Sequence, residues 1–293
     1  MTAEAMKSAV SLDISPLTPT FGAEISGVDL SQPISDQLAA AIVDAFHQYS
    51  ALVFRGQDMT PAEFSRFSSI FGELDVHHLA EHTFPDHPEV RVLSNMKKDN
   101  KHVGQFRGGH FWHTDISYKK KVALATILHG KICPPVGADS LVADMYAAYE
   151  SMPESLKKKL EGKMAIHDRN FRYEFLYPER PPLTPEQISH VPPVEHPCII
   201  AHPETGRKAV YIVEHFVSRI GDLDEDESQE LVKEVIQFVT QPQFVYAHKW
   251  QVGDVAMWDD RCTLHSATSY EYDKYDRLLY RTQIKGGEPF YRA

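Results

Sequence analysis

Hydrophobic and polar positions along the chain follow two periods, and these periods predict an alternation of helices and strands. Apolar residues three or four positions apart mark one face of an α-helix, as Leu38, Ile42 and Phe46 do after the N-cap residue Ser35. The predicted helices cover residues 35–49, 60–71, 145–150, 153–160 and 224–240. Short apolar runs predict strands at 51–54, 90–93, 122–129, 210–213, 244–246, 255–258, 262–265 and 278–284.

Strands at both ends of the core, with helices inserted between them, indicate the fold class. We expect an α+β protein with a double-stranded β-helix, or jelly-roll, core that is decorated by helices. No internal repeat divides the sequence, so residues 1–293 are expected to form a single domain. The chain is long enough to bury a substantial core.

Two segments lack any period. Residues 95–110 are polar, basic and glycine-rich, and they are either a mobile lid or a plain surface loop. Residues 169–194 are rich in proline, tyrosine and arginine, and we expect an excursion over the core.

Composition and charge exclude several classes of protein. The net charge of −11 argues against nucleic-acid binding, and no apolar run is long enough to span a membrane. The first eleven residues lack the layout of a signal peptide. Three scattered cysteines favour a reducing cytoplasm over a disulfide framework, and Cys262 is interpreted as a buried structural thiol.

The segment Phe111-Trp112-His113-Thr114-Asp115 contains the sequence's one His-x-Asp motif. Aromatic and β-branched neighbours predict a strand, on which His113 and Asp115 would point the same way. Non-haem Fe(II) is often bound by a triad of two histidines and one carboxylate, and His113 and Asp115 would supply two of these three ligands. His265, which ends a later strand, is the candidate for the third ligand. A lone His-x-Asp is common, so the motif carries weight only together with its context.

The last predicted strand carries arginines on one face. Arg277, Leu279 and Arg281 share that face by the period of two. The two arginines lie roughly 13 Å apart along a strand, so they could hold two separate anionic groups. A solvent-facing edge strand is the alternative, which Leu279 between them makes weaker.

Three segments in this order resemble the Fe(II)/2-oxoglutarate dioxygenases of the taurine dioxygenase and phenoxyacetate-herbicide dioxygenase (TauD/TfdA) family. The segments are Trp112–Asp115, Trp258–His265 and Arg277–Arg281, and the chain's end, 286–292, is also similar. The resemblance extends from about Leu17 to the end of the chain. It implies an oxidoreductase that uses Fe(II), 2-oxoglutarate and dioxygen, and that releases succinate and CO₂.

The resemblance also assigns roles to individual residues. His113, Asp115 and His265 match the family's iron ligands. Arg277 matches the arginine that binds the distal carboxylate of 2-oxoglutarate, and Ser140 stands where the family usually has a threonine that assists it.

The substrate is expected to be a small anion, namely a carboxylate, a sulfonate or an aryloxyalkanoate. Arg281 and His77 match residues that contact substrate in the family. Gly109 and Ala80 replace an asparagine and a tyrosine of the sulfonate enzyme's pocket, which argues against taurine itself. Hydroxylation, desaturation and C–O or C–S cleavage all fall within the family's chemistry. Its members commonly form homo-oligomers, so an oligomer is expected here too.

Two other classes of protein use similar patterns. A Zn-dependent hydrolase or lyase on a jelly roll could use the same triad, but it has no need for a buried arginine that grips a dicarboxylate. A non-catalytic binding protein of this fold would be expected to lack a ligand, and none of the three is missing.

Overall fold

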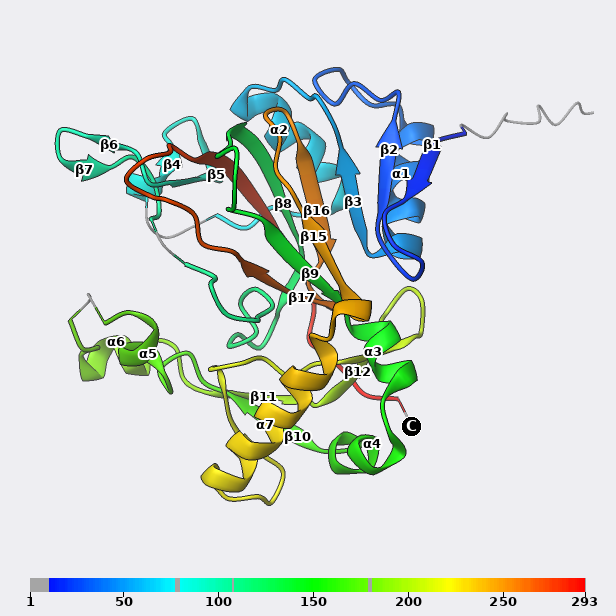
Figure 1. Ribbon diagram of the computed structural model, residues 1–293, viewed down its shortest axis with the longest axis vertical. Helices are drawn as coiled ribbons and strands as arrows, with labels where there is room; N and C mark the ends of the chain where they lie inside the picture. The colour runs from blue at the N-terminus through cyan, green and yellow to red at the C-terminus, as the bar shows by residue number, and fades with distance from the viewer. Residues whose placement is uncertain (1–10, 77–79, 107, 179–180, 293) are drawn as a thin grey trace, which may run out of the picture.

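The computed structural model describes residues 11–76, 80–106, 108–178 and 181–292 (Figure 1). The α-helices are α1 (Asp36–Tyr49), α2 (Pro61–Ser68), α3 (Met145–Ser151), α4 (Glu154–Leu160), α5 (Tyr173–Leu176), α6 (Pro185–Ser189) and α7 (Glu225–Val239). Short 3₁₀ turns are η1 (Ser69–Phe71), η2 (Ala80–His82) and η3 (Pro242–Phe244).

The first nine strands are β1 (Asp13–Pro16), β2 (Ala23–Ser26), β3 (Ala51–Phe54), β4 (Thr83–Phe84), β5 (His87–Ser94), β6 (Lys97–Lys98), β7 (Lys101–His102), β8 (Ala123–Ile132) and β9 (Ser140–Asp144). The other nine are β10 (Met164–His167), β11 (Val194–Pro197), β12 (Ile199–Ala201), β13 (Lys208–Val210), β14 (Val217–Ile220), β15 (Val245–His248), β16 (Val255–Asp259), β17 (Thr263–Ala267) and β18 (Leu278–Lys285).

Two sheets face each other in the upper half of the molecule. The larger has eight strands in the order β1-β2-β3-β16-β8-β18-β5-β4, and the smaller has three in the order β15-β9-β17. A buried cluster between them joins Val142 of the small sheet to Ala256 and Leu279 of the large one. This arrangement confirms the predicted α+β class with a jelly-roll core.

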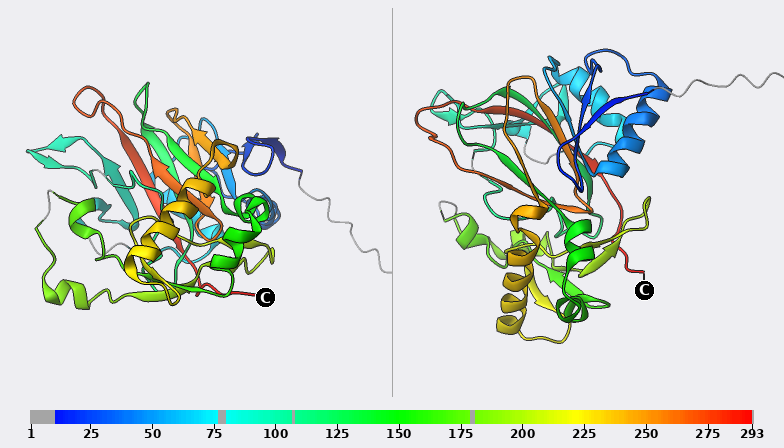
Figure 2. Two further views of the ribbon diagram at one scale, coloured as in Figure 1. Left: turned by 60° about the horizontal axis from the view of Figure 1, so that its bottom comes forward. Right: turned by 45° about the vertical axis from the view of Figure 1, so that its right-hand side comes forward.

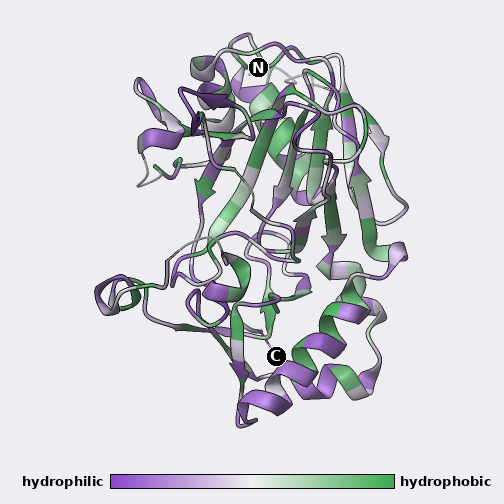
Figure 3. Cartoon of the chain, turned by 60° about the vertical axis from the view of Figure 1, so that its left-hand side comes forward, coloured by the Kyte–Doolittle hydropathy of each residue, from purple (hydrophilic) through white to green (hydrophobic). Residues whose placement is uncertain are grey.

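Strand β3 shows how the sequence period places side chains on both faces of the large sheet. Leu52 and Phe54 pack with residues of α1 and α2, whereas Ala51 and Val53 face the small sheet. The two helices therefore cover the outer face of the sheet, as Figure 2 shows from two further sides. Figure 3 shows hydrophobic residues along the central strands and hydrophilic residues in the connecting loops.

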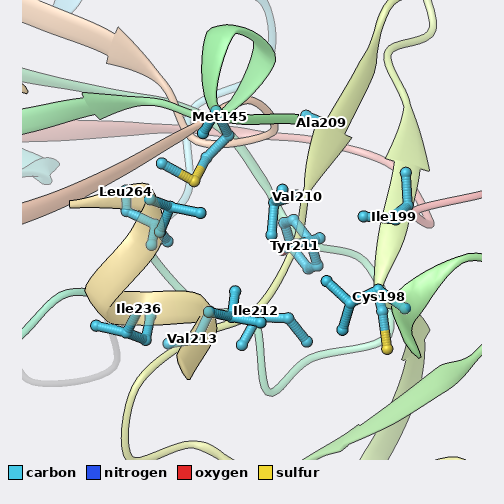
Figure 4. Packing of buried hydrophobic residues seen from close by; sticks show 14 of the residues in the cluster. Met145, Cys198, Ile199, Ala209, Val210, Tyr211, Ile212, Val213, Ile236 and Leu264 are labelled. Carbon is cyan, nitrogen blue, oxygen red and sulfur yellow. The ribbon is translucent and has the colours of Figure 1, made fainter. Parts of the chain in front are cut away.

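A second core lies below the sheets, where α3, α4 and α7 pack with β10 to β14 (Figure 1). Figure 4 shows Met145 of α3, Leu264 of β17 and Ile236 of α7 in this cluster, with Tyr211 close by. Leu264 belongs to this cluster, whereas its neighbour His265 points to the opposite face of β17. The lower core thus supports one strand of the candidate site from behind.

Capping explains why the predicted helices begin where they do. The Ser35 side chain accepts a hydrogen bond from the Leu38 N–H, and Thr60 and Glu63 form a reciprocal capping box. Asp224 and Glu227 form another at the start of α7. The predicted helices at 35–49, 60–71 and 224–240 are confirmed, and 60–71 divides into α2 and η1.

The two segments without a sequence period contain short elements. Residues 169–194 include α5 and α6, and their role as an excursion over the core stays a prediction. The segment 95–110 includes the hairpin β6–β7, and the strand predicted at 210–213 ends at Val210. Among the described helices, none is both long and apolar enough to cross a lipid bilayer.

Candidate metal and anion site

The segment around His113 is not the strand that its composition predicts. Only His113 pairs, in an isolated bridge with His265, through N···O distances of 3.0 and 2.7 Å. Asp115 begins a turn, and Ile116 follows with a left-handed φ of 49°. The Asp115 backbone N–H donates to Asp260 Oδ1 at an N···O distance of 3.3 Å, in place of a strand partner.

The turn still brings the three predicted ligand residues together. The donor atoms of His113, Asp115 and His265 all lie within 4.8 Å of one another. His113 Nε2 is 4.0 Å from Asp115 Oδ1, and His265 Nε2 is 3.8 Å from Asp115 Oδ2. Two imidazole nitrogens and one carboxylate therefore lie close enough together to share one metal ion, and this donor set suits Fe(II).

Both histidines are in the form that can bind a metal. The His113 Nδ1 atom lies 2.8 Å from the Phe111 carbonyl oxygen, so its N–H points there and Nε2 keeps its lone pair. Burial lowers the pKa of His113, and burial together with the nearby His113 lowers the pKa of His265 still further. Neutral imidazoles result, and these need no deprotonation before they coordinate.

The carboxylate of Asp115 is held ionised by its neighbours. Burial alone would raise its pKa, but Arg281, the two histidines and Thr126 together lower it well below the ordinary value. Arg281 Nη2 donates to Asp115 Oδ2 at 2.5 Å, and the Thr126 hydroxyl donates to the same oxygen at 2.5 Å. Burial and the charge of Asp115 raise the pKa of the adjacent Asp260.

Arg277 carries a guanidinium that no described group neutralises. No carboxylate of the described residues lies within 4.0 Å of it, and its buried Nε atom has no hydrogen-bond partner. Burial lowers the pKa of Arg277, because water cannot reach the charge. A buried cation without a partner is costly, so an incoming carboxylate would be bound strongly here.

Ser140 is buried at the start of β9, where its hydroxyl accepts a hydrogen bond from the Trp250 indole N–H at 3.1 Å. Trp250 belongs to the cluster between the sheets, against which Cys133, a neighbour of Arg277, also packs. Ser140 and Arg277 therefore border the same interior region.

The remaining predicted site residues have different outcomes. Arg281 pairs through Nη2 with Asp115, while its buried Nε atom has no hydrogen-bond partner, so its contact with a substrate stays a prediction. His77 lies outside the described residues, so its role stays a prediction. Sequence reasoning missed Thr126, Asp260 and Arg91; the available signal for Thr126 and Arg91 was a polar residue inside an otherwise apolar predicted strand.

The segment predicted to be either a lid or a surface loop is hydrogen-bonded to β5 and to β17. The Gln105 backbone pairs with β5, through an N···O distance of 2.9 Å to the Val92 carbonyl. Gly109 accepts a hydrogen bond from the Ala267 N–H at 2.7 Å, and a Cβ there would lie 3.0 Å from His113 Cε1. Gly109 has a φ of +71°. Glycine fits this position because it has no Cβ and readily adopts a positive φ. Whether the segment moves stays a prediction.

A second group of metal-ligand type has a structural explanation. His202, Asp259 and Cys262 also place their donor atoms within 4.8 Å of one another. However, Arg261 donates from Nε and Nη2 to both oxygens of Asp259, at 2.8 and 2.6 Å. Burial raises the pKa of the Cys262 thiol well above its ordinary value, in agreement with the expected structural role.

Comparison with known proteins agrees with this geometry. Residues 13–283 match the family described as taurine catabolism dioxygenase TauD, TfdA family. The chain is 32% identical, over 286 residues, to the alpha-ketoglutarate-dependent 2,4-dichlorophenoxyacetate dioxygenase of Cupriavidus pinatubonensis, with 94% of this chain and 98% of that one covered. It is 30% identical to the alpha-ketoglutarate-dependent sulfate ester dioxygenase of Pseudomonas putida, with 96% and 92% covered.

Solved structures give the same result. A taurine dioxygenase from Burkholderia xenovorans superimposes with a TM-score of 0.79 at 31% identity, covering 96% of this chain and 93% of that one. AAD-2 in complex with Mn(II) and N-oxalylglycine gives a TM-score of 0.81 at 27% identity, covering 96% and 99%. Sequence, fold and site geometry agree: this chain belongs to the TauD/TfdA family of alpha-ketoglutarate-dependent dioxygenases.

Proposed function

We propose that this chain is an Fe(II)- and 2-oxoglutarate-dependent dioxygenase in which His113, Asp115 and His265 hold the iron. The observation that carries the proposal is the close set of two neutral imidazoles and one ionised carboxylate. A facial triad of this kind leaves positions open for a co-substrate and for dioxygen. When bound, the iron supplies the activation of dioxygen that couples 2-oxoglutarate decarboxylation to substrate oxidation.

Arg277 and Ser140 are proposed to bind the distal carboxylate of 2-oxoglutarate. The unpaired guanidinium supports this role, because a planar fork matches a carboxylate and its charge persists at all working pH values. Ser140 Oγ already accepts the Trp250 N–H, so its own hydrogen can be donated to a carboxylate oxygen.

Arg281 is proposed to orient both the metal ligand and the substrate. Its Nη2 atom holds Asp115, while its buried Nε atom has no hydrogen-bond partner. The relatives named above act on a phenoxyacetate and on sulfate esters, which supports a small anionic organic substrate. His77 is retained as a further substrate contact. Which substrate bond is oxidised then determines whether the outcome is hydroxylation, desaturation or C–O or C–S cleavage.

The Zn hydrolase or lyase alternative has lost its support. Neither the matching family nor the relatives named above is described as a hydrolase or a lyase. An arginine poised for a dicarboxylate also has no role in that chemistry.

We further propose a homo-oligomer in the cytoplasm; the free, scattered cysteines support that location.

The proposal is tested by titration under strict anaerobiosis. Fe(II) and then 2-oxoglutarate are added to metal-free protein, and the visible charge-transfer band of the chelate is recorded. A saturable band is expected, followed by succinate release when oxygen and a substrate are admitted. Folded protein that binds a divalent metal but gives no band with 2-oxoglutarate would contradict the proposal.

A further inference from the structure

Two consecutive side chains hold the backbone of Arg277, the residue proposed to bind the distal carboxylate of 2-oxoglutarate. The Arg277 backbone N–H donates to Asn95 Oδ1 at 2.8 Å, and the Ser94 hydroxyl donates to the Arg277 carbonyl oxygen at 2.8 Å. Ser94 is buried at the end of β5, and Asn95 follows it directly. We refer to Ser94 and Asn95 together as the backbone clamp, because they bind both polar groups of the Arg277 backbone.

Asn95 also holds the connection that leads to Arg277. This connection, residues 268–277, joins β17, the strand of the candidate ligand His265, to β18. Asn95 Nδ2 donates to the carbonyl oxygens of Tyr272 and Tyr275, at 2.8 and 2.9 Å. Only one orientation of the amide satisfies these partners, because the Arg277 N–H needs an acceptor and the two carbonyl groups need donors.

Strand pairing does not hold Arg277 in place. The register of β18 begins at Leu278, which pairs with Ser94 of β5 and with Ile132 of β8. On the side of β8 this register shifts directly after Leu278. Among the described residues, no register pair includes Arg277. The clamp therefore supplies the hydrogen bonds that a neighbouring strand would otherwise provide.

The guanidinium of Arg277 lacks a comparable anchor. Its buried Nε atom has no hydrogen-bond partner, and no carboxylate of the described residues lies within 4.0 Å. Its titratable neighbours are Tyr270, Cys133 and Tyr272, and the backbone of Tyr272 is itself held by Asn95. A binding group works only when it is placed to within about 0.5 Å. The backbone position of Arg277 therefore matters for the carboxylate that it meets.

We propose that Ser94 and Asn95 are positioning residues for 2-oxoglutarate, which act by fixing the Arg277 backbone so that its guanidinium meets the distal carboxylate. The inference rests on the proposed function and assigns a role to the first residue of the segment 95–110. The alternative is a purely structural clamp, which closes the connection 268–277 and has no effect on the choice of co-substrate.

The test compares two 2-oxo acids that share the metal-chelating end. 2-Oxoglutarate has the distal carboxylate, whereas 2-oxopentanoate has a methyl group in its place. Each acid is titrated into Fe(II)-loaded protein under strict anaerobiosis, and the charge-transfer band gives its Kd. We expect the wild type to prefer 2-oxoglutarate by about thirtyfold or more, as the loss of a buried charge pair implies.

Variants of the clamp should reduce this preference. Asn95→Ala should lower it about tenfold, while the affinity for 2-oxopentanoate changes by about threefold or less. Ser94→Ala removes a single hydrogen bond and should lower the preference about threefold, whereas Ser94→Thr keeps the hydroxyl and should retain it. Asn170→Ala is the matched control, because it removes an amide that donates to the Val191 carbonyl oxygen at 3.2 Å.

A double variant tests whether the clamp acts through Arg277. Arg277→Met removes the group that the clamp positions, so adding Asn95→Ala should leave the remaining preference unchanged. A further fall of the preference in the double variant would show another route of action and would overturn the inference.

Three other results would also decide against the clamp as a positioning device. Equal weakening of both acids in Asn95→Ala would assign it to the fold alone, and an unchanged preference would show that Arg277 does not need it. If Asn95→Ala fails to fold, equal preferences in Ser94→Ala and Ser94→Thr have the same meaning. Wild-type protein that binds Fe(II) but neither acid would overturn the proposed function, whereas a normal preference that all clamp variants retain overturns this inference alone.

Discussion

Two polar clusters adjoin the turn that connects β16 to β17, and they differ in one respect. One is the candidate metal cluster of His113, Asp115 and His265; the other is the Asp259 network, formed by His202, Glu204, Asp259, Arg261 and Cys262. Each contains three groups of metal-ligand type with donor atoms within 4.8 Å of one another. Distance alone therefore cannot tell which one binds a metal.

Hydrogen bonding separates the two clusters. In the Asp259 network, Arg261 donates to both oxygens of Asp259, and from Nη1 to Glu204 at 2.7 Å. No buried side-chain nitrogen or oxygen atom of the described network lacks a hydrogen-bond partner. Around the candidate metal cluster, the buried His265 Nδ1, Arg277 Nε and Arg281 Nε atoms have none. A saturated network stabilises the fold, whereas an unsaturated one still has donors or acceptors available for a ligand.

The largest expected effect is on Fe(II) affinity, which should depend on one cluster and not on the other. His265→Ala should abolish the anaerobic Fe(II)–2-oxoglutarate band and weaken Fe(II) binding by more than the ~10–100-fold typical of changes to outer partners. His202→Ala is the matched control, because it removes an equally buried imidazole from the other cluster. Calorimetric metal titration measures both. Weaker Fe(II) binding in His202→Ala than in His265→Ala would reverse the comparison.

The second prediction compares the two clusters by their contribution to the free energy of unfolding. Arg261→Ala leaves Asp259 buried and unpaired, so we expect the free energy of unfolding to fall by about 3–5 kcal/mol. Urea unfolding monitored by circular dichroism measures the change. A loss below about 1 kcal/mol would mean that the saturated network does not support the fold as proposed.

Arg277→Met, unlike Arg261→Ala, is not expected to lower the free energy of unfolding. It removes a buried charge without a described partner, so stability in the absence of ligand should stay the same or rise. Affinity for 2-oxoglutarate should fall by about thirtyfold or more, corresponding to about 2 kcal/mol. The anaerobic band, titrated with 2-oxoglutarate, gives the affinity. If Arg277→Met bound 2-oxoglutarate normally, the assignment of the distal carboxylate would be wrong.

His167 shows the limit of the comparison, because both its ring nitrogens are buried without partners and yet no ligand is needed. Burial, and after it His196, lowers the pKa of His167 well below the ordinary value, so the folded chain holds it neutral. Below about pH 6.5 the unfolded chain takes up a proton that the folded chain refuses. Stability should therefore fall by up to about 1.4 kcal/mol per pH unit as the pH drops, until the folded-state pKa is reached.

His167→Phe should remove this contribution while it preserves ring packing against Tyr211. Urea unfolding at pH 7, 6 and 5 measures the slope in both proteins. An unchanged slope in the variant would assign the acid sensitivity to other groups.

Much of the site could be predicted from local patterns. Motif spacing selected His113, Asp115 and His265, and the period of two placed Leu279 on the inner face and Tyr280 on the outer one. Capping boxes likewise fixed the starts of the helices, because a cap acts within four residues of itself. Each of these features depends on neighbours in the sequence.

Other features were decided by contacts between distant segments. Asp259 belongs to the Asp259 network, whereas its neighbour Asp260 accepts a hydrogen bond from the Asp115 backbone, in a segment that forms a turn where a strand was predicted. Composition favoured a strand at this segment, but a carboxylate 145 residues away provided the competing acceptor.

By itself, the sequence determined the identity of the candidate ligands, the face on which each strand residue lies and the starts of the main helices, because these follow from local periods and local hydrogen bonds. Only the tertiary structure decided that Arg281 pairs with Asp115, that Arg91 lies opposite Arg281, and that one carboxylate cluster is saturated while the other is not. These outcomes depend on strand register, and register is set by the packing of the whole core.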